Sequence, residues 1–358
     1  MVSTPPVDVV TEDLVSICER IGSSLSALSG KTILVAGGSG FLGSYFLDTI
    51  IHANDHILTE PCQILCVDNF KSGPPERLLH LQDRADFRLL EQDLSQPLTI
   101  TESVDYIVHT ASLASPSLYR QFPLQTIDVN VFGTRSLLDI ALQHKAKSFV
   151  YLSSSEIYGD PDSDSIPTPE TYRGNVSSTG PRACYDESKR LAETLCMTYY
   201  RQYDLPVKII RPFNVYGPRL GLNDGRVMPD FLKDALDGRP ITLLSDGNAT
   251  RSFCYVSDAI TACFLLLLSD ANGEAFNVGN PDEITIRQLA QQIESMFDNN
   301  PGLDSATSDD PDYLTDNPIR RCPDLTKIKE TISWESTVNL EAGLQKTIQW
   351  HLSQQSPQ

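Results

Sequence analysis

The stretch Lys31-Thr-Ile-Leu-Val-Ala-Gly-Gly-Ser-Gly-Phe-Leu-Gly43 decides the fold. It begins as a short apolar strand and runs into Gly37-x-x-Gly40-x-x-Gly43, and a helix is predicted over residues 44–51. Glycines at such a junction permit a tight turn and let the backbone approach a pyrophosphate, whose charge the helix N-terminus stabilises. The motif therefore predicts a dinucleotide site. The expected contacts with the dinucleotide are Gly37, Gly40, Phe41, Leu42 and Gly43.

Short apolar runs continue to alternate with helical sequence after this motif. Strands are predicted over residues 63–67, 87–90, 106–108, 149–152 and 207–210, and a helix is predicted over residues 124–143. Strands that alternate with helices of this length form a parallel sheet. The sequence therefore predicts an α/β fold, in which a doubly wound parallel sheet of the Rossmann type carries a smaller C-terminal substrate-binding lobe.

Three regions are expected along the chain. Residues 1–29 are predicted to be an N-terminal helical extension with one amphipathic helix, because apolar residues recur there at three- and four-residue steps. Residues 30–211 are predicted to be the Rossmann domain, to which segments near residues 253–280 return. Residues 212–358 are predicted to form mainly the substrate-binding lobe. The apolar residues of the extension are Leu14, Ile17, Ile21, Leu25 and Leu28.

The composition limits the kinds of partner. The 358 residues carry a formal net charge of −19, so nucleic acid is not expected as a partner, whereas an anionic small molecule is compatible with a few arginines gathered in a cleft. No metal site is predicted. The longest apolar run, residues 262–268, is too short to span a membrane. Eight cysteines without a Cys-x-x-Cys pair, and no apparent secretory signal, predict a cytoplasmic protein.

Side chains after the later strands define the expected cofactor more closely. Asp68 closes the second strand, where a carboxylate accepts hydrogen bonds from the adenosine ribose and repels a 2′-phosphate. The sequence therefore favours NAD over NADP, although Lys71 lies close by in the sequence. Further contacts with the cofactor are expected beside Asp68, around the adenine and at the middle of the dinucleotide. For the residues around the adenine and at the middle of the dinucleotide, a turn or core role fits the residue type equally well. The residues of all these further contacts are Asn69, Asp93, Leu94, Ala111 and Ser112.

Tyr185 and Lys189 lie four residues apart in a predicted helix and therefore share one face. We expect the Lys189 ammonium to lower the pKa of the Tyr185 phenol from its usual value of about 10. A phenolate near neutral pH takes the proton of an alcohol while the carbon-bound hydrogen leaves as hydride to a nicotinamide. The pair predicts the oxidation of an alcohol, and both residues are expected to contact the cofactor as well.

Several further blocks carry a resemblance to a known superfamily. With the glycine motif, they are similar to the extended short-chain dehydrogenases/reductases, the superfamily of NAD-dependent epimerases and dehydratases, from about residue 31 to about residue 352. Within it, the chain most resembles the UDP-glucuronate decarboxylases (UDP-xylose synthases). The blocks are Ser153-Ser-Ser-Glu-Ile-Tyr-Gly-Asp-Pro161, Gly180-Pro-Arg-Ala-Cys-Tyr-Asp-Glu-Ser-Lys-Arg190, Arg211-Pro-Phe-Asn-Val-Tyr-Gly-Pro-Arg219, Asn223-Asp-Gly-Arg-Val227, Arg251-Ser-Phe-Cys-Tyr-Val-Ser-Asp258 and Asn317-Pro-Ile-Arg-Arg-Cys-Pro-Asp324.

The resemblance implies a nucleotide-sugar substrate and a catalytic set. Tyr185 and Lys189 would oxidise C4 of the sugar, and Ser154, in place of the threonine usual in decarboxylases, would hydrogen-bond the C4 oxygen. A C4 ketone lies β to the C6 carboxylate of a glucuronosyl group, so carbon dioxide leaves easily. Glu156 and Arg321 would assist decarboxylation and the reprotonation of C5. The product would be UDP-xylose or a 4-keto pentose.

The resemblance also implies substrate contacts. Asn214, Arg226 and Arg251 would hold the nucleotide diphosphate and its ribose, because the planar fork of an arginine pairs two oxygens at once. Tyr119 would line the sugar pocket, to which Arg321 also belongs. The chain departs from the decarboxylases where residues 176–179 lack the usual Asn-Pro. It also has Asp128 where a lysine is common, which requires this carboxylate to point away from an acidic substrate.

Two alternative functions remain. A nucleotide-sugar 4-epimerase or 4,6-dehydratase begins with the same C4 oxidation, but dehydratases usually have Asp-Glu where this chain has Ser155-Glu156, and simple epimerases usually lack an acid at position 156. A non-catalytic dinucleotide-binding scaffold is the other alternative, against which the intact catalytic set argues. A homodimer is expected, since in this superfamily the helix that carries Tyr185 and the helix before Ser148 commonly pack against their copies.

Overall fold

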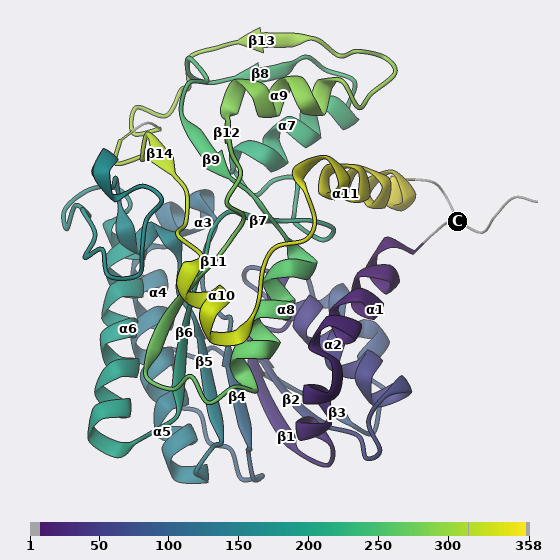
Figure 1. Cartoon of the computed structure of the whole chain (residues 1–358), viewed down its shortest axis with the longest axis vertical. Coiled ribbons are helices and arrows are strands. Elements are labelled where there is room, and N and C mark those ends of the chain that lie inside the picture. The colour runs from purple at the N-terminus through teal and green to yellow at the C-terminus, as the bar shows by residue number, and fades with distance from the viewer. Residues whose placement is uncertain (1–7, 314, 356–358) are drawn as a thin grey trace, which may run out of the picture.

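A seven-stranded parallel sheet forms the centre of the protein. The computed structural model describes residues 8–313 and 315–355. The strand order β11-β6-β5-β4-β1-β2-β3 places β1 in the interior of the sheet (Figure 1), and every pairing within the sheet is parallel. The strands are β1 (Thr32–Ala36), β2 (Gln63–Asp68), β3 (Phe87–Glu91), β4 (Tyr106–His109), β5 (Ser148–Leu152), β6 (Val207–Pro212) and β11 (Glu274–Val278).

Helices cover both faces of this sheet, as in the predicted doubly wound fold. Successive side chains of β1 point to opposite faces, so Ile33 and Val35 pack with α1, α2 and α8, whereas Leu34 and Ala36 pack with α5 and α6. This two-sided burial explains why β1 reads as an uninterrupted apolar run. The covering helices are α1 (Val9–Ile21), α2 (Phe41–His56), α4 (Pro123–Asp128), α5 (Thr134–His144), α6 (Ala183–Tyr203) and α8 (Val256–Leu267).

Two predicted helices are interrupted. The N-terminal apolar stripe is buried as expected, but it lies on two elements, because α1 ends at Gly22 (φ 62°) and a 3-10 helix (Gly22–Leu28) continues it. The helix predicted over residues 124–143 is divided by a π-helical turn, Val129–Gly133. Helix α2 is longer than predicted and begins at Phe41, within the glycine motif, so that Gly40 is its N-cap and Gly43 lies in its first turn.

A smaller set of elements lies above the carboxyl ends of the strands (Figure 1). Of the segments near residues 253–280 that were expected to return to the Rossmann domain, 274–278 adds β11 to the sheet, and residues 253–268 form mainly α8, which packs against β5 and β6. The smaller elements are α3 (Pro116–Gln121), β7 (Val215–Tyr216), α7 (Val227–Leu236), β8 (Ile241–Leu243), β9 (Thr250–Ser252), β10 (Cys254–Tyr255), β12 (Glu283–Thr285), α9 (Ile286–Glu294), β13 (Leu303–Ser305), β14 (Arg320–Arg321), α10 (Thr326–Ile332) and α11 (Leu340–Gln355), with short 3-10 helices at Pro75–Leu81, Ser155–Tyr158 and Ser163–Ser165.

A buried carboxylate joins the N-terminal helix to the rest of the molecule. Asp13 of α1 is 1% exposed and accepts hydrogen bonds from the hydroxyls of Tyr45 (3.2 Å) and Tyr255 (2.8 Å) and from the Lys346 ammonium (2.9 Å). These partners come from α2, β10 and α11. Helix α1 is therefore an integral part of the core that links the sheet to the C-terminal helix.

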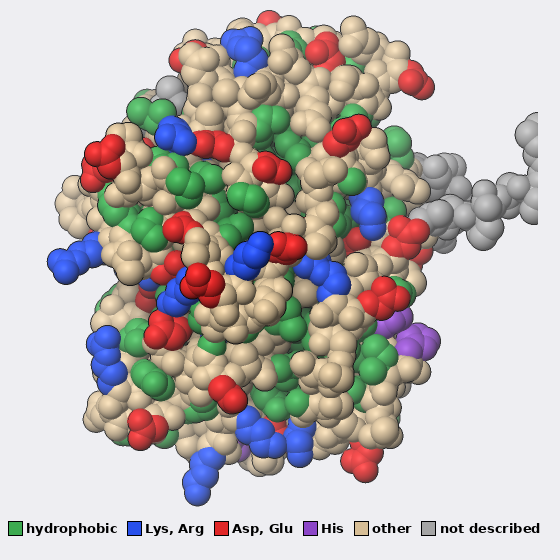
Figure 2. Space-filling model, viewed as in Figure 1, with side chains coloured by type: hydrophobic (Ala, Val, Ile, Leu, Met, Phe, Trp, Pro, Cys, Tyr) green, Lys and Arg blue, Asp and Glu red, His purple; other side chains and the backbone are tan. Residues whose placement is uncertain are grey.

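The surface is mixed in charge. Figure 2 shows acidic and basic side chains interspersed over the face that it presents. Among the described residues, no helix is long and apolar enough to cross a bilayer. Within the same part of the chain, no group of three or more His, Cys, Asp or Glu side chains is arranged to hold a metal ion.

Candidate active site

Two adjoining cavities lie along the carboxyl ends of the strands. A large cleft of about 870 Å³ and a smaller cavity of about 30 Å³ share Gly37, Ala111 and Ser112 in their walls. This is where ligands bind in open α/β sheets. The structure places every predicted site residue in the wall of one cavity or the other. Their individual roles remain predictions.

The glycine motif forms a close backbone cradle at the junction of β1 and α2. Gly37 has φ 86°, and a Cβ there would lie 2.6 Å from the Ala111 Cα. A Cβ on Gly43 would lie 2.0 Å from the Gly37 carbonyl oxygen. Phe41 and Leu42 open α2, and the first amides of a helix have no intrahelical acceptor. The cradle therefore fits a dinucleotide pyrophosphate, since the backbone is bare and its amides are free to donate.

The smaller cavity is lined by the residues expected at the adenosine half of such a cofactor. The Asp68 carboxylate is 7% exposed and accepts hydrogen bonds from the Ser39 and Phe70 amides, both at 2.8 Å. Lys71 points its ammonium at Asp93 (3.1 Å). Because Lys71 is paired in this way, its charge does not offset the repulsion between Asp68 and a 2′-phosphate, so the geometry favours NAD.

Asp93 acts mainly as an anchor for this end of the cavity. It accepts hydrogen bonds from Asn69 Nδ2 (3.0 Å), from Lys71 and from the Ser95 amide (3.0 Å). Burial acts to raise the pKa of Asp93, but these bonds outweigh it and hold the pKa at about 2. Asn69 and Asp93 therefore shape the cavity as a bonded pair, with Leu94 beside them in its wall.

Tyr185 and Lys189 lie one turn apart on α6, deep in the large cleft. The Lys189 ammonium donates a 2.7 Å hydrogen bond to the Leu152 carbonyl oxygen and lies 5.8 Å from the centre of the Tyr185 ring. Burial raises the pKa of Tyr185 to about 12, while a hydrogen bond with Ser154 acts to lower it. Burial lowers the pKa of Lys189 to about 7. The expected depression of the Tyr185 pKa is therefore wrong for the protein alone, because the loss of hydration outweighs the hydrogen bond with Ser154.

Tyr119 packs directly on Tyr185. It is 1% exposed, and its ring is stacked on that of Tyr185 with centres 5.2 Å apart and planes 17° apart. Tyr119 comes from α3, which is short and begins at Pro116. The stacking fixes the plane of the Tyr185 ring and supports the predicted place of Tyr119 in a sugar pocket.

Glu156 is clamped between two arginines. Arg321 donates two hydrogen bonds to its carboxylate, at 2.5 and 2.7 Å, and Arg182 forms an ion pair with the same group. Burial acts to raise the pKa of Glu156, but both guanidinium groups outweigh burial and hold the pKa well below its usual range. Glu156 is therefore ionised at neutral pH.

Arg182 and Asp186 belong to this cluster, although the sequence reasoning gave them no role. Asp186 lies one turn after Arg182, with 3.9 Å between its Oδ2 and the Arg182 Nε. Burial, and then the charge of Glu156, raise the pKa of Asp186 to about 8. Arg182 stands three residues before Tyr185, directly before α6, but this spacing alone does not indicate its contact with Glu156.

The outer part of the cleft is rich in arginine. Arg251 donates to the Thr250 carbonyl (2.7 Å) and to Asn317 Oδ1 (3.0 Å), and burial, and then the charge of Arg321, lower the pKa of Arg251 to about 9. Arg226 pairs with Asp224 (3.0 Å), and Asn214, held at φ 40°, donates to the Ser252 carbonyl.

The cleft as a whole is cationic. Eight basic side chains line it against three carboxylates, although the chain carries a net charge of −19. Such a cleft attracts an anionic ligand. Asp128, half-buried at the end of α4, lines neither cavity, as an acidic substrate requires.

Comparisons with known proteins agree with this geometry. Residues 33–279 match the NAD dependent epimerase/dehydratase family. The chain is 40% identical to UDP-glucuronic acid decarboxylase 1 of Arabidopsis thaliana over 88% of its own length and 68% of the relative. It is 39% identical to UDP-glucuronic acid decarboxylase 1 of Danio rerio, over 91% and 74% of the two chains.

Solved structures share the fold. The UDP-glucose 4-epimerase of Thermotoga maritima, solved with UDP-glucose, superimposes with a TM-score of 0.80 at 26% identity, over 91% of this chain and 100% of that one. The dTDP-glucose 4,6-dehydratase of Bacillus anthracis, solved with NAD, gives a TM-score of 0.76 at 26% identity, over 91% and 98%.

Proposed function

Because the chain belongs to the NAD dependent epimerase/dehydratase family, we propose that it oxidises C4 of a nucleotide sugar and decarboxylates UDP-glucuronate. The product is UDP-xylose or a UDP-linked 4-keto pentose. The observation that carries the proposal is the ionised Glu156, clamped by Arg182 and Arg321 in the same cationic cleft as the Tyr185–Lys189 pair.

The first step uses the residues at the inner end of the cleft. Ser154 and Tyr185, which hydrogen-bond each other, receive the C4 hydroxyl of the sugar between them. Tyr185 takes the hydroxyl proton, and Lys189 compensates the charge that develops on the phenol oxygen. When bound along the glycine motif, NAD would supply the hydride acceptor for C4 and a positive charge near the phenol, and the same hydride would return to C4 where UDP-xylose is the product. Because both side chains are buried, this added positive charge has a strong effect on the Tyr185 proton.

The second step follows from the position of the ketone. The C4 ketone lies β to the C6 carboxylate, so carbon dioxide leaves while its bonding electrons delocalise into the C4 oxygen. Arg182 and Arg321 stabilise negative charge in this part of the cleft. Glu156 is already deprotonated, so it must accept a proton before it can return one to C5.

The alternatives have less support. A 4,6-dehydratase needs an acid as well as a base for the removal of water, and position 155 holds a buried serine. The epimerase and dehydratase structures compared above are 26% identical to the chain, whereas the decarboxylase relatives are 39–40% identical. A scaffold without activity has no need for a stacked tyrosine, a buried lysine and a clamped glutamate in one cleft.

Mass spectrometry of the products tests the proposal. Purified protein is incubated with NAD and a panel of UDP-, dTDP-, GDP- and CDP-sugars. We expect UDP-glucuronate to lose about 44 mass units, the mass of carbon dioxide. A loss of about 18 units from another sugar identifies a dehydratase, and an isomer of unchanged mass identifies an epimerase.

We further propose a cytoplasmic homodimer with no nucleic-acid or membrane partner. Large apolar side chains are exposed on neighbouring helices of one sheet face, including Leu124 (71%) and Phe132 (57%) near α4 and Leu191 (47%) on α6. Helices α4 and α6 pack side by side. In a two-fold symmetric dimer, the same helices of a second copy of the chain would pack against this apolar surface.

A further inference from the structure

A buried ion pair lies one helical turn beyond the catalytic lysine. Glu193 follows Lys189 by four residues on α6, so both side chains lie on one face of the helix. Arg211 of β6 binds Glu193 through two hydrogen bonds, Nε to Oε1 at 2.9 Å and Nη2 to Oε2 at 2.6 Å. Both side chains are only 11% exposed. A bidentate pair of this kind fixes the orientation of both partners.

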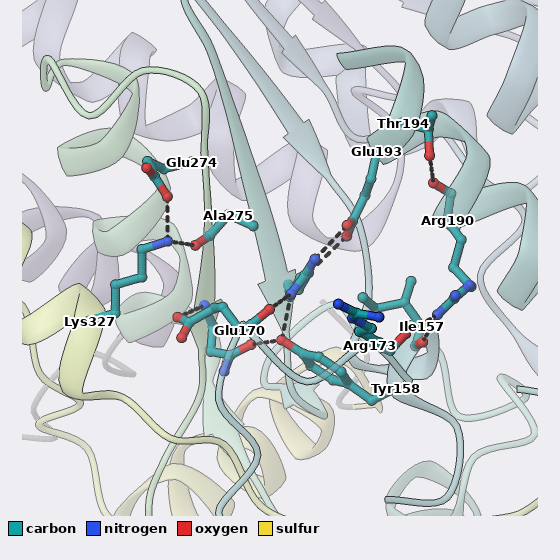
Figure 3. Close-up of polar contacts among 12 residues, drawn as sticks. Ile157, Tyr158, Glu170, Arg173, Arg190, Glu193, Thr194, Glu274, Ala275 and Lys327 are labelled. Carbon is teal, nitrogen blue, oxygen red and sulfur yellow. Dashed lines mark hydrogen bonds and ion pairs between the residues drawn. The ribbon is translucent and has the colours of Figure 1, made fainter. Parts of the chain in front are cut away.

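The same guanidinium also contacts the segment that follows Glu156. Arg211 Nη1 donates to the Tyr158 hydroxyl (2.8 Å) and to the Glu170 carbonyl oxygen (3.0 Å). Tyr158 in turn donates to Asn277 Oδ1 (2.7 Å). Figure 3 shows Glu193, Tyr158 and Glu170 converging on this network. The pair therefore ties α6 to the short 3-10 helix that begins one residue before Glu156.

Asn277 extends the network to the segment that carries Arg321. Its Nδ2 donates to the carbonyl oxygens of Thr168 (2.8 Å) and Asp324 (3.1 Å). Thr168 also forms a parallel bridge with Pro323. One buried polar network thus joins the helix of Tyr185 and Lys189 to both sides of the glutamate clamp.

The charges around Lys189 give Glu193 a second effect. Two groups of β5 face the Lys189 ammonium. They are the Leu152 carbonyl and the Tyr151 ring, whose centre is 4.9 Å away. Burial lowers the pKa of Lys189 to about 7, and Glu193, followed by Cys196, acts to raise it. On β4, His109 is neutral, because burial lowers its pKa to about 3. Glu193 is thus the carboxylate that favours the ammonium, and Arg211 partly cancels its charge.

We propose that Glu193 and Arg211 are positioning residues, whose ion pair sets the charge and the place of the Lys189 amine. The inference rests on the proposed oxidation by Tyr185 and Lys189. The balance between the two charges matters as much as the contact itself. Without Arg211, the unpaired Glu193 carboxylate would raise the pKa of Lys189. Without Glu193, the unpaired Arg211 guanidinium would lower it.

Variants that remove one charge at a time test the proposal. Glu193→Gln leaves the Arg211 cation, so the pKa of Lys189 falls, whereas Arg211→Met leaves the Glu193 anion, so the pKa rises. We expect shifts of about one unit in opposite directions. The measurement is the pH titration of the Lys189 Cε signal by NMR in NAD-bound protein labelled at lysine, with Lys189→Arg to assign the signal.

Conservative and neutral variants separate charge from folding. Arg211→Lys and Glu193→Asp keep the charges and are expected to titrate close to the wild type. The double variant Glu193→Gln/Arg211→Met leaves no uncompensated buried charge, so it remains informative if a single variant does not fold. We expect its pKa to lie below that of the wild type and above that of Glu193→Gln. Equal pKa values in the wild type and the double variant, or shifts of the single variants in one direction, would overturn the inference.

Single-turnover reduction of bound NAD, followed by absorbance, gives the functional readout. Both single-charge variants are expected to slow this step at least about tenfold, with partial rescue by Arg211→Lys. The NMR titration needs no substrate, so the two proposals can fail separately. Opposed titration shifts in a protein that converts no nucleotide sugar would reject the proposed function alone. A decarboxylase whose variants show no opposed shifts would reject the role of the ion pair alone.

Discussion

The proton balance of two buried side chains decides whether the candidate site can act as a base. Burial moves the pKa of Tyr185 up to about 12 and that of Lys189 down to about 7, so in the protein alone the phenol is neutral near pH 7 while the amine is divided between its charged and neutral forms. A positively charged nicotinamide ring beside them favours the phenolate instead. The reactivity of Tyr185 is therefore expected to depend on the bound oxidised cofactor.

Tyr185→Phe removes the group that takes the proton. We expect the rate of product formation from UDP-glucuronate to fall about 10²- to 10⁴-fold, the usual contribution of a general base. The variant should still bind the nucleotide sugar, which isothermal titration measures. Tyr203→Phe, an exposed position near the end of the same helix, is the matched control. If Tyr185→Phe keeps its activity, the non-catalytic scaffold is favoured over the proposed enzyme.

Asp186→Asn tests the buried acid cluster through the pH dependence of stability. The pKa of Asp186 is raised to about 8 in the folded state, against about 3.9 in the unfolded chain. Between these values the folded state keeps a proton that the unfolded state releases, so the wild type loses stability as the pH rises. The variant should be about as stable as the wild type near pH 4 and more stable by roughly 1–3 kcal/mol near pH 8.

Urea unfolding at several pH values measures this difference. A constant difference between the two proteins across the range would show that Asp186 titrates normally. Glu187→Gln, at the partly exposed neighbour on the same helix, is the matched control.

At the scale of elements, the π-helical turn Val129–Gly133 connects the loop that follows β4 to helix α6. Asn130 within it accepts a hydrogen bond from Ser112 (2.8 Å) and donates one to Ser188 (2.9 Å). Ser112 lies in the wall of both cavities, and Ser188 precedes Lys189 on α6. The inserted residue of a π-turn directs one side chain inward where a regular helix would not.

Asn130→Ala removes this connection. We expect a loss of about 1–3 kcal/mol in the free energy of unfolding, because Asn130 is fully buried and its two partners lose a bond. NAD affinity should also fall, since Ser112 is no longer held. Chemical denaturation and cofactor titration measure the two effects, and the exposed Asn299→Ala serves as the control.

Helix periodicity predicted where these elements lie but not how they are interrupted. The central strands were predictable because burial on both faces makes them largely apolar, and the glycine motif located the cradle. The π-turn was missed because its apolar pattern resembles that of a continuous helix over residues 124–143. The roles of Arg182 and Asp186 were missed because they depend on a glutamate about 26–30 residues away, and the sequence carries no local mark of such a contact. The Tyr185 pKa was misjudged because burial cannot be read from spacing.

At the scale of the whole molecule, the protein combines a negative chain with a cationic cleft. Arginine and lysine outnumber carboxylates in the cleft where a nucleotide diphosphate and a carboxylate are proposed to bind, although the chain as a whole is acidic. The same contrast leaves the helices α4 to α6 available for apolar contact with a second copy.

Leu124→Glu tests the proposed dimer. Leu124 is 71% exposed, so a charge there does not disturb the core but opposes burial in an interface. We expect light scattering to give a dimer for the wild type and a monomer for the variant at micromolar concentration, with unchanged circular dichroism. Leu79→Glu, exposed at 55% in the Pro75–Leu81 segment, is the control. A wild type that is monomeric would reject the dimer.

The bond between Asp13 and Lys346 has a consequence for the order of the chain itself. It brings the first half of α1 against the middle of α11, and Figure 1 shows the start of α1 and the end of α11 on the same side of the molecule. Joining these ends by a short linker and cutting the backbone at an exposed loop would give a circular permutant with the same sheet and the same cleft. The linear order of the segments is therefore separable from the architecture that they build.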